Sequence, residues 1–289
     1  SLTIGSNGEY SATSGTTTMT SKNSSNYIMD LDGTFTHNNG TVRINSTGSG
    51  DQLVDLIPSS GTLYDLEINE NSSNPVQYNG NTTIANDLTI VEGIFQFFDN
   101  NNSNLTVTGD VSIQDGGQLA ASGWIGAGEF GTLTIASGGT YEATSGTTTL
   151  TGPYIDDHFL YQNAGTFTHN KGTVIFSYTS YANLRSGGDA FYNLISDVNH
   201  GAYVGIQIMD ALEVMNNLTI NANDGFTCAN GDVTVHGNVY CNGDWSRYNT
   251  SSRTQTIKGT LTIGSAGYYR PSSGTNNLGG IRNLGGSVN

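Results

Sequence analysis

The chain is poor in charged residues and in residues that favour helices. Asp, Glu, Lys and Arg make up only 11% of its 289 residues, against about 25% in a typical soluble protein. Glycine, with 39 residues, and abundant Ser, Thr and Asn take the place of the missing Ala, Leu, Glu and Lys. Such a composition disfavours helices and favours strands joined by Gly and Asn turns.

Basic residues and long apolar runs are also scarce. The chain has 9 Lys and Arg against 24 acidic residues, and its net charge of −15 would repel a phosphate backbone, so we expect no nucleic acid partner. No run approaches the roughly 18 apolar residues of a membrane span, and no basic segment with an apolar core resembles a signal peptide. The chain opens at Ser1 without Met, and we expect a processed or excised piece of something longer.

Hydrophobic residues are present at 35%, including 15 Tyr and 10 Phe, and they fall in short alternating strings. This period of two is typical of half-buried strands and argues against disorder. The strings are Leu2–Ile4, Leu88–Ile90, Leu105–Val107, Leu133–Ile135, Leu218–Ile220 and Leu261–Ile263.

An internal repeat of about 130 residues is the strongest pattern in the sequence. The segment from Leu2 to Thr20 returns from Leu133 to Thr151 and begins again at Leu261, and residues 33–42 return as residues 165–174. The sequence therefore predicts a first copy at residues 1–132, a second at 133–260, and the start of a third copy or an end cap at 261–289.

Each copy divides into strand-turn units about 17 to 28 residues apart, which is the spacing of coils in a solenoid. The predicted fold class is all-β, a parallel β-helix or β-solenoid, in which every coil must stack on its neighbours to bury its apolar face. Tandem β-sandwich domains are the alternative. The 4 Pro residues and the recurring Leu-Thr-Ile strings favour stacked coils.

A family resemblance is carried by residues 33–42, by the apolar-Tyr-Asx-Leu strings at 63–66 and 191–194, and by the Leu-Thr-Ile strings. These motifs resemble the β-strand-repeat proteins of environmental phage tail fibres, virion appendages and bacterial surface adhesins. The resemblance implies a structural, non-enzymatic fibre or spacer outside the cell, at a cell surface or on a virion. It implies no cofactor, and its partners would be further copies of the repeat, other copies of the chain, or surface glycans. A carbohydrate-binding adhesin shaft and a polysaccharide-degrading β-helix enzyme are the alternatives.

The most reactive cluster in the sequence is Asp156, Asp157 and His158, because polysaccharide-cutting enzymes work with grouped carboxylates. Its counterpart in the first copy, around residues 24–26, has none of the three residues. We therefore favour a solvated loop, and we expect the copies to differ mainly in loops such as residues 154–158.

Two further candidates concern metal binding. Asp30 and Asp32 suggest calcium, but the second copy has Gln162 and Ala164 at these positions, so no metal is predicted. His37 and His169 occupy the same place in both copies, and we interpret them as turn-flanking residues that hydrogen-bond the adjacent corner.

The remaining candidates are the cysteines and certain aromatic residues. Cys228 and Cys241 align with Phe97 and Ile113, which predicts that both face the core, either as a disulfide or as small buried hydrophobic residues. Sugar-stacking is a candidate role for some aromatic residues, with core stacking or capping as the alternative. These aromatic residues are Trp124, Tyr154, Tyr181 and Trp245.

Overall fold

The fold is known from a computed structural model that describes most of the chain. The described residues contain strands, turns and bends but no helix. They are residues 1–22, 27–45, 52–55, 62–70, 75–97, 103–121, 126–152, 159–178, 181–197, 205–245 and 252–288.

The strands form a parallel β-solenoid, as the sequence predicts. Leu88 pairs in parallel with Val111, and Val111 pairs in turn with Leu133, so each coil lies on the coil before it. The partner spacing ranges from 19 residues, between Gly225 and Asp244, to 27 residues, between Leu2 and Met29. Because the described ladders are parallel, the antiparallel β-sandwich alternative is excluded.

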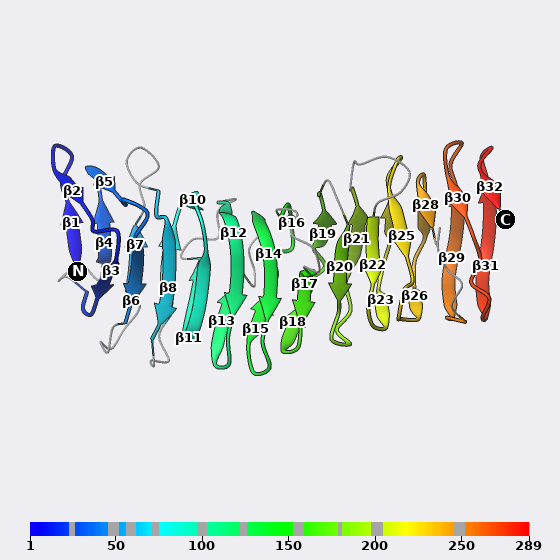
Figure 1. Cartoon of the computed structure of the whole chain (residues 1–289), viewed down its shortest axis with the longest axis horizontal. Coiled ribbons are helices and arrows are strands. Elements are labelled where there is room, and N and C mark those ends of the chain that lie inside the picture. The colour runs from blue at the N-terminus through cyan, green and yellow to red at the C-terminus, as the bar shows by residue number, and fades with distance from the viewer. Residues whose placement is uncertain are drawn as a thin grey trace. The chain divides into compact units, whose positions relative to one another are not determined.

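The chain divides into two compact units. Unit 1 comprises Ser1–Gly146 and Ala164–Phe167. The predicted copy boundaries follow the sequence repeat rather than these contacts, and they stay a prediction. The strands of unit 1 are β1 (Leu2–Ile4), β2 (Glu9–Ser11), β3 (Thr16–Met19), β4 (Tyr27–Leu31), β5 (Thr34–Thr36), β6 (Thr41–Ile44), β7 (Gln52–Asp55), β8 (Asp65–Asn69), β9 (Val76–Asn79), β10 (Thr82–Ile84), β11 (Leu88–Phe97), β12 (Leu105–Ile113), β13 (Gly117–Ala120), β14 (Ala127–Ile135), β15 (Thr140–Glu142) and the first two residues of β18 (Thr166–Thr168) (Figure 1).

Unit 2 comprises Thr147–Asn163 and Thr168–Asn289. One of its coils runs through β24, β25 and β26 before the chain returns to β27, which pairs with β24. Its strands are β16 (Thr147–Leu150), β17 (Phe159–Asn163), β19 (Thr173–Phe176), β20 (Ala182–Arg185), β21 (Asn193–Ser196), β22 (Gly205–Ile208), β23 (Leu212–Val214), β24 (Leu218–Ile220), β25 (Gly225–Thr227), β26 (Val233–Val235), β27 (Val239–Cys241), β28 (Asp244–Trp245), β29 (Gln255–Ile263), β30 (Tyr268–Tyr269), β31 (Asn276–Asn283) and β32 (Ser287–Val288).

The core lies inside the coils and follows the alternation of the strings. In β24, Leu218 and Ile220 are fully buried, while Thr219 between them is half-buried. The pairing register places each such residue on its equivalent in the next coil, so buried Leu218 lies on buried Val239. Apolar side chains therefore form continuous ladders, which stabilise neighbouring coils together rather than one at a time.

One corner of the coil requires glycine. A Cβ atom on Gly33 would lie 2.3 Å from the carbonyl oxygens of both Gly5 and Gly8, in the coil below. A Cβ atom on Gly165 would lie 2.3 Å from the oxygen of Gly139. Because real Cβ atoms do not approach an oxygen so closely, a side chain here would push the coils apart. The high glycine content therefore serves coil stacking as well as turns.

Candidate functional site

Five of the residues singled out in the sequence lie outside the described residues. They are Trp124, Tyr154, Asp156, Asp157 and His158. The candidate catalytic cluster and two of the candidate sugar-binding residues therefore stay predictions. Tyr181 is described, and it is 49% exposed.

Trp245 is buried in unit 2 and its ring is not at the surface. The ring packs edge-on against Phe226 on one side and Tyr269 on the other, with centroid distances of 5.6 Å in both cases. Such T-shaped contacts between stacked coils are favourable beyond the buried area alone. For Trp245 the structure thus supports core stacking, which was the alternative to sugar binding.

Asp30 and Asp32 lie on and just after β4. Asp30 is half-buried, and its partners in the neighbouring strands are Thr3 and Asp55. Asp32 is exposed, and its backbone N–H donates to the carbonyl oxygen of Ile4 at 2.8 Å. Within the described part of the chain, no group of three or more His, Cys, Asp or Glu residues is arranged to hold a metal ion.

His37 and His169 flank turns in the same way, which confirms their interpretation. His37 Nδ1 accepts the backbone N–H of Asn39 at 2.9 Å, and His169 Nδ1 accepts that of Lys171 at 2.9 Å. Both donors have positive φ, 58° and 63°, in the left-handed region of the turn. Burial, together with the charge of Lys171, lowers the pKa of His169. The neutral ring is the form that can accept the hydrogen bond.

Cys228 and Cys241 both face the core, as their alignment predicts, and both are present as thiols. Burial raises the pKa of Cys241 to about 12. Its Sγ donates to the carbonyl oxygens of Gly243 and Tyr268, each at 3.4 Å. In this setting the thiol is unreactive and acts as a small core residue.

A ladder of carboxylates lines one corner of unit 1. Each carboxylate accepts a hydrogen bond from the next coil: Asp65 Oδ1 accepts the N–H of Asp87 at 3.2 Å, and Asp87 Oδ1 accepts that of Asp110 at 2.8 Å. Asp110 Oδ1 then accepts the hydroxyl of Thr132 at 2.7 Å. Burial, followed by the charges of Asp110 and Asp65, raises the pKa of Asp87. We call Asp65, Asp87 and Asp110 the carboxylate ladder.

Unit 2 makes the same ladder from amides. Asn193 Oδ1 accepts the N–H of Asn217 at 3.3 Å, and Asn217 Oδ1 accepts that of Asn238 at 3.0 Å. Asn238 Oδ1 accepts the N–H of Thr260 at 2.9 Å. We call these three Asn residues the amide ladder. The geometry repeats between the copies, but the charge does not.

A row of larger side chains follows the same corner of unit 2. Each side chain of the row comes one or two residues before a residue of the amide ladder or before Thr173 or Thr260, which lie in the adjoining coils. Lys258 Nζ lies 3.1 Å from His236 Nδ1, and His236 Nε2 lies 2.6 Å from Glu213 Oε1. At the other end of the row, the ring of Tyr192 lies 5.5 Å from the ring of His169, which is two residues before Lys171. We call this row the corner ridge, consisting of Lys171, Tyr192, Met215, His236 and Lys258.

Sequence reasoning missed the corner ridge, although a signal exists. Met215, His236 and Lys258 are separated by 21 and 22 residues, which is one coil at each step. The first-copy counterparts of Met215 and His236 are Ala85 and Thr108, whereas Phe130, which the sequence offset aligns with Lys258, is buried in the core. A search for reactive residues spaced by one coil would have found the row. By the same internal comparison, Met215, His236 and Lys258 are specific to the second copy, whereas Tyr192 has a counterpart in Tyr64, whose ring lies 5.4 Å from that of His37.

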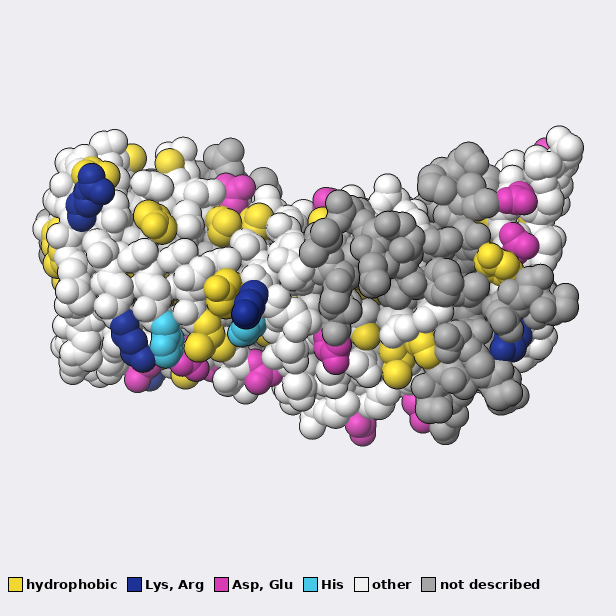
Figure 2. Space-filling view, turned by 180° about the vertical axis from the view of Figure 1, so that it is seen from behind, with side chains coloured by type: hydrophobic (Ala, Val, Ile, Leu, Met, Phe, Trp, Pro, Cys, Tyr) yellow, Lys and Arg dark blue, Asp and Glu magenta, His cyan; other side chains and the backbone are white. Residues whose placement is uncertain are grey.

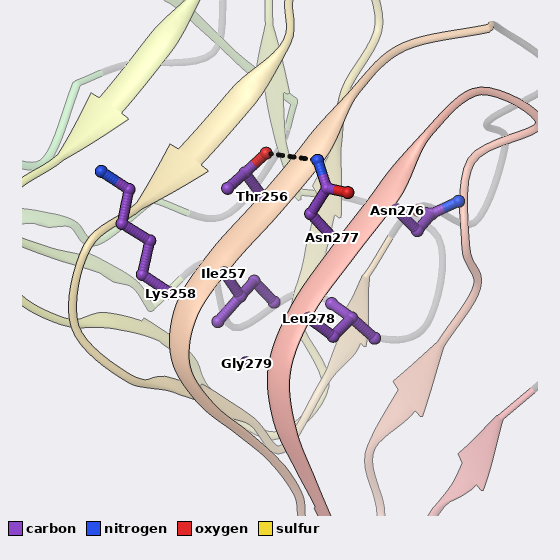
Figure 3. A pocket seen from close by; sticks show the side chains of 7 residues that line it. All are labelled: Thr256, Ile257, Lys258, Asn276, Asn277, Leu278 and Gly279. Atoms are coloured by element: carbon purple, nitrogen blue, oxygen red, sulfur yellow. Dashed lines mark hydrogen bonds between the residues drawn. The ribbon is translucent and has the colours of Figure 1, made fainter.

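A shallow hollow of about 530 Å³ lies over β29 and β31. The amide of Asn277 points toward Thr256, to which it donates a hydrogen bond at 3.4 Å, while Lys258 extends away from both (Figure 3). The hollow offers hydrogen-bonding groups but no carboxylate among its described lining. That lining is Thr256, Ile257, Lys258, Asn276, Asn277, Leu278 and Gly279.

Comparison with known proteins adds no relative. No family model, no curated protein and no solved structure matches the chain. Among the described segments, none forms a helix long and apolar enough to cross a lipid bilayer. The function is therefore argued from the coils and their side chains.

Proposed function

We propose that the chain is a structural, non-enzymatic spacer, a segment of a fibre on a virion or a cell surface. The observation that carries this proposal is the double connection between coils. Strands join neighbouring coils through their backbones, and the carboxylate and amide ladders join them again through side chains at the corner. Solenoids of this kind gain their stability from each coil-to-coil contact, which suits a stiff element. The resemblance to phage fibre and adhesin repeats supports the location.

Single-molecule pulling on the chain tests this role directly. We expect resistance to extension and rupture in steps, because coils are held by their neighbours. Release of one 22-residue coil, the spacing of Val111 and Leu133, would lengthen the chain by about 75 Å at the reach of an extended backbone. Extension without resistance would contradict the role, and release of reducing ends from a polysaccharide would contradict the absence of enzymatic activity.

A carbohydrate-binding shaft is the second candidate, and two exposed rings favour it. Tyr181 is 49% exposed and Tyr240 is 41% exposed, and Tyr240 stands on β27 between Thr219 and Thr262 of the adjoining coils. An exposed ring flanked by hydroxyl groups can stack on a sugar and hydrogen-bond it. On a glycan array, Tyr181→Ala and Tyr240→Ala should each weaken a signal that Met215→Ala leaves unchanged. An array without any signal would remove this candidate.

A further inference from the structure

A row of outward-facing side chains crosses successive coils of unit 2. Parallel pairing places Thr219, Tyr240, Thr262 and Arg282 next to one another in β24, β27, β29 and β31. Tyr240 and Arg282 are exposed, and the two Thr residues are half-buried. Neighbouring members of the row are one strand spacing apart, about 4.8 Å, so Arg282 follows Tyr240 at a distance of two coils. We call these four residues the outer row.

The amide ladder runs beside the outer row and supplies hydrogen-bond donors. Asn217 and Asn238 each come two residues before a member of the row, Thr219 and Tyr240. The Oδ1 atom of each amide already accepts the N–H of the next coil, at 3.0 Å and 2.9 Å. Their NH2 groups can therefore donate to acceptors of a ligand that lies over the row.

The last coils carry positive charge without acidic residues. Residues 245–289 contain five of the 9 basic residues and none of the 24 acidic ones. Within the described part of the chain, no carboxylate forms an ion pair with Arg282. In the coil of Tyr240, Asp232 Oδ1 accepts a backbone N–H at 2.8 Å, and Asp244 pairs with Arg270 at 3.4 Å. The left-hand end of Figure 2, where the C-terminal coils lie, shows Lys or Arg and hydrophobic side chains in a mostly uncharged surface.

The first copy lacks this combination of groups. Ser112 stands at the position of Tyr240, and the carboxylate ladder takes the place of the amide ladder. Coil stacking therefore needs neither the exposed ring nor the neutral amides. The carboxylates of the first copy would repel an anionic ligand, whereas the corresponding face of unit 2 offers it donors and a cation.

From these differences we propose that the outer row of unit 2 binds an acidic glycan, a chain of sugars that carry carboxylate groups. The Tyr240 ring stacks on one sugar, while the neighbouring amides and Thr hydroxyls donate hydrogen bonds to its oxygens. Arg282, two coils further along, pairs with a carboxylate of the same glycan. The proposal rests on the second candidate function, the carbohydrate-binding shaft, and adds to it the class of sugar.

Three variants and one control separate the contributions. Tyr240→Ser introduces the residue that the first copy carries at this position, so the coil loses the ring and keeps its fold. Asn217→Asp/Asn238→Asp introduces the carboxylates that the corner of unit 1 accommodates. Arg282→Gln removes the charge at the end of the row. Lys171→Gln removes one exposed charge outside the row and is the matched control.

Calorimetric titration of the full chain with an alginate oligosaccharide, which consists of uronic sugars, and with a neutral dextran oligosaccharide provides the test. Alginate should bind more tightly than dextran, and its binding should weaken between about 0.15 M and about 0.5 M salt. Tyr240→Ser should weaken alginate binding about tenfold, and Arg282→Gln about threefold to tenfold. Asn217→Asp/Asn238→Asp should abolish alginate binding, whereas Lys171→Gln should leave it unchanged.

The outcomes distinguish the class of sugar from the binding of sugars in general. Equal affinity for alginate and dextran, lost in Tyr240→Ser, would overturn the acidic class and leave the carbohydrate-binding shaft in place. Alginate binding that Arg282→Gln and Lys171→Gln weaken equally would indicate attraction by net charge alone and would also overturn the proposal. Binding of neither glycan would overturn both the proposal and the shaft on this face, while the spacer role is decided separately by the pulling experiment.

Discussion

Replacing one carboxylate of the ladder in unit 1 should stabilise the protein at neutral pH. In the Asp87→Asn variant the side chain keeps an Oδ1 atom that can accept the N–H of Asp110, now at 2.8 Å. The variant loses only the charge, and unit 2 shows at Asn217 that an amide satisfies the same geometry. The change in unfolding free energy therefore depends on whether the negative charge of Asp87 stabilises or destabilises the folded chain.

The energies favour the neutral side chain. At the coil spacing of about 4.8 Å, two like charges near water repel by about 1 kcal/mol, and Asp87 has such a neighbour on either side. Loss of a charge-assisted hydrogen bond offsets part of this gain. The pKa of Asp87 is raised, so burial and repulsion outweigh the hydrogen bond. With solvent screening, we expect the variant to gain about 1 kcal/mol in unfolding free energy at pH 7.

The pH dependence gives the prediction its sign. Because the pKa of Asp87 in the folded chain lies above its ordinary value of 3.8, ionisation costs more in the folded chain than in the unfolded one. The native chain therefore gains stability as pH falls through the raised pKa toward 3.8. The Asp87→Asn variant lacks this gain. Its stability advantage over the native chain is therefore full at pH 7 and disappears below pH 3.8.

Hydrogen exchange of β8, β11 and β12 at increasing urea concentration reports the stability of unit 1 by itself. Asn217→Asp is the matched change in unit 2, and it should destabilise β21, β24 and β27 at pH 7 by a smaller amount, because its neighbours Asn193 and Asn238 are neutral. The reasoning is refuted if Asp87→Asn lowers the stability of unit 1 at pH 7, or if its effect is the same at pH 7 and in acid.

Three other predictions follow from the corners and the core. Gly33→Ala should lower the unfolding free energy by about 2 kcal/mol in urea titrations, because its Cβ would meet two carbonyl oxygens, whereas Gly5→Ala has nothing within 4 Å and should cost less. Cys241, with a pKa of about 12, should resist iodoacetamide at pH 8 until the chain is unfolded, as intact-mass measurement would show; rapid labelling of the native chain contradicts its burial. Because the pKa of His169 is lowered in the folded chain, the unfolded chain binds the proton first as the pH falls, and the unfolding free energy should decrease below pH 6.5. Hydrogen exchange of the Lys171 amide should accelerate over the same range, since that amide donates to His169 Nδ1. The His169→Gln variant should lack this pH dependence.

The fold could be predicted from the sequence because stacked coils require apolar residues at every second position of each strand, and this alternation is visible in the sequence. The Leu-Thr-Ile strings record which residues face inward, and Leu218, Ile220, Leu261 and Ile263 are indeed buried. The single-coil offset could be predicted only as a range, since corners and loops differ in length from coil to coil. The demand for glycine at Gly33 could not be predicted, because it depends on carbonyl oxygens of a different coil.

The candidate site was harder to predict, because its residues are close in space only after the coils have stacked. Glu213, His236 and Lys258 read as isolated charges along the chain, although the structure brings them within hydrogen-bonding distance. Trp245 illustrates the converse. Its place outside the alternating strings left both sugar stacking and core stacking open, and the structure shows that neighbouring coils enclose it between two other rings.

The two ladders show that the corner requires a hydrogen-bond acceptor but does not require a charge. Every coil needs an acceptor for the N–H of the next coil, since an unsatisfied donor there would cost free energy, and both Asp87 and Asn217 provide one. Geometry alone therefore does not explain why unit 1 carries carboxylates, which repel one another along the stack.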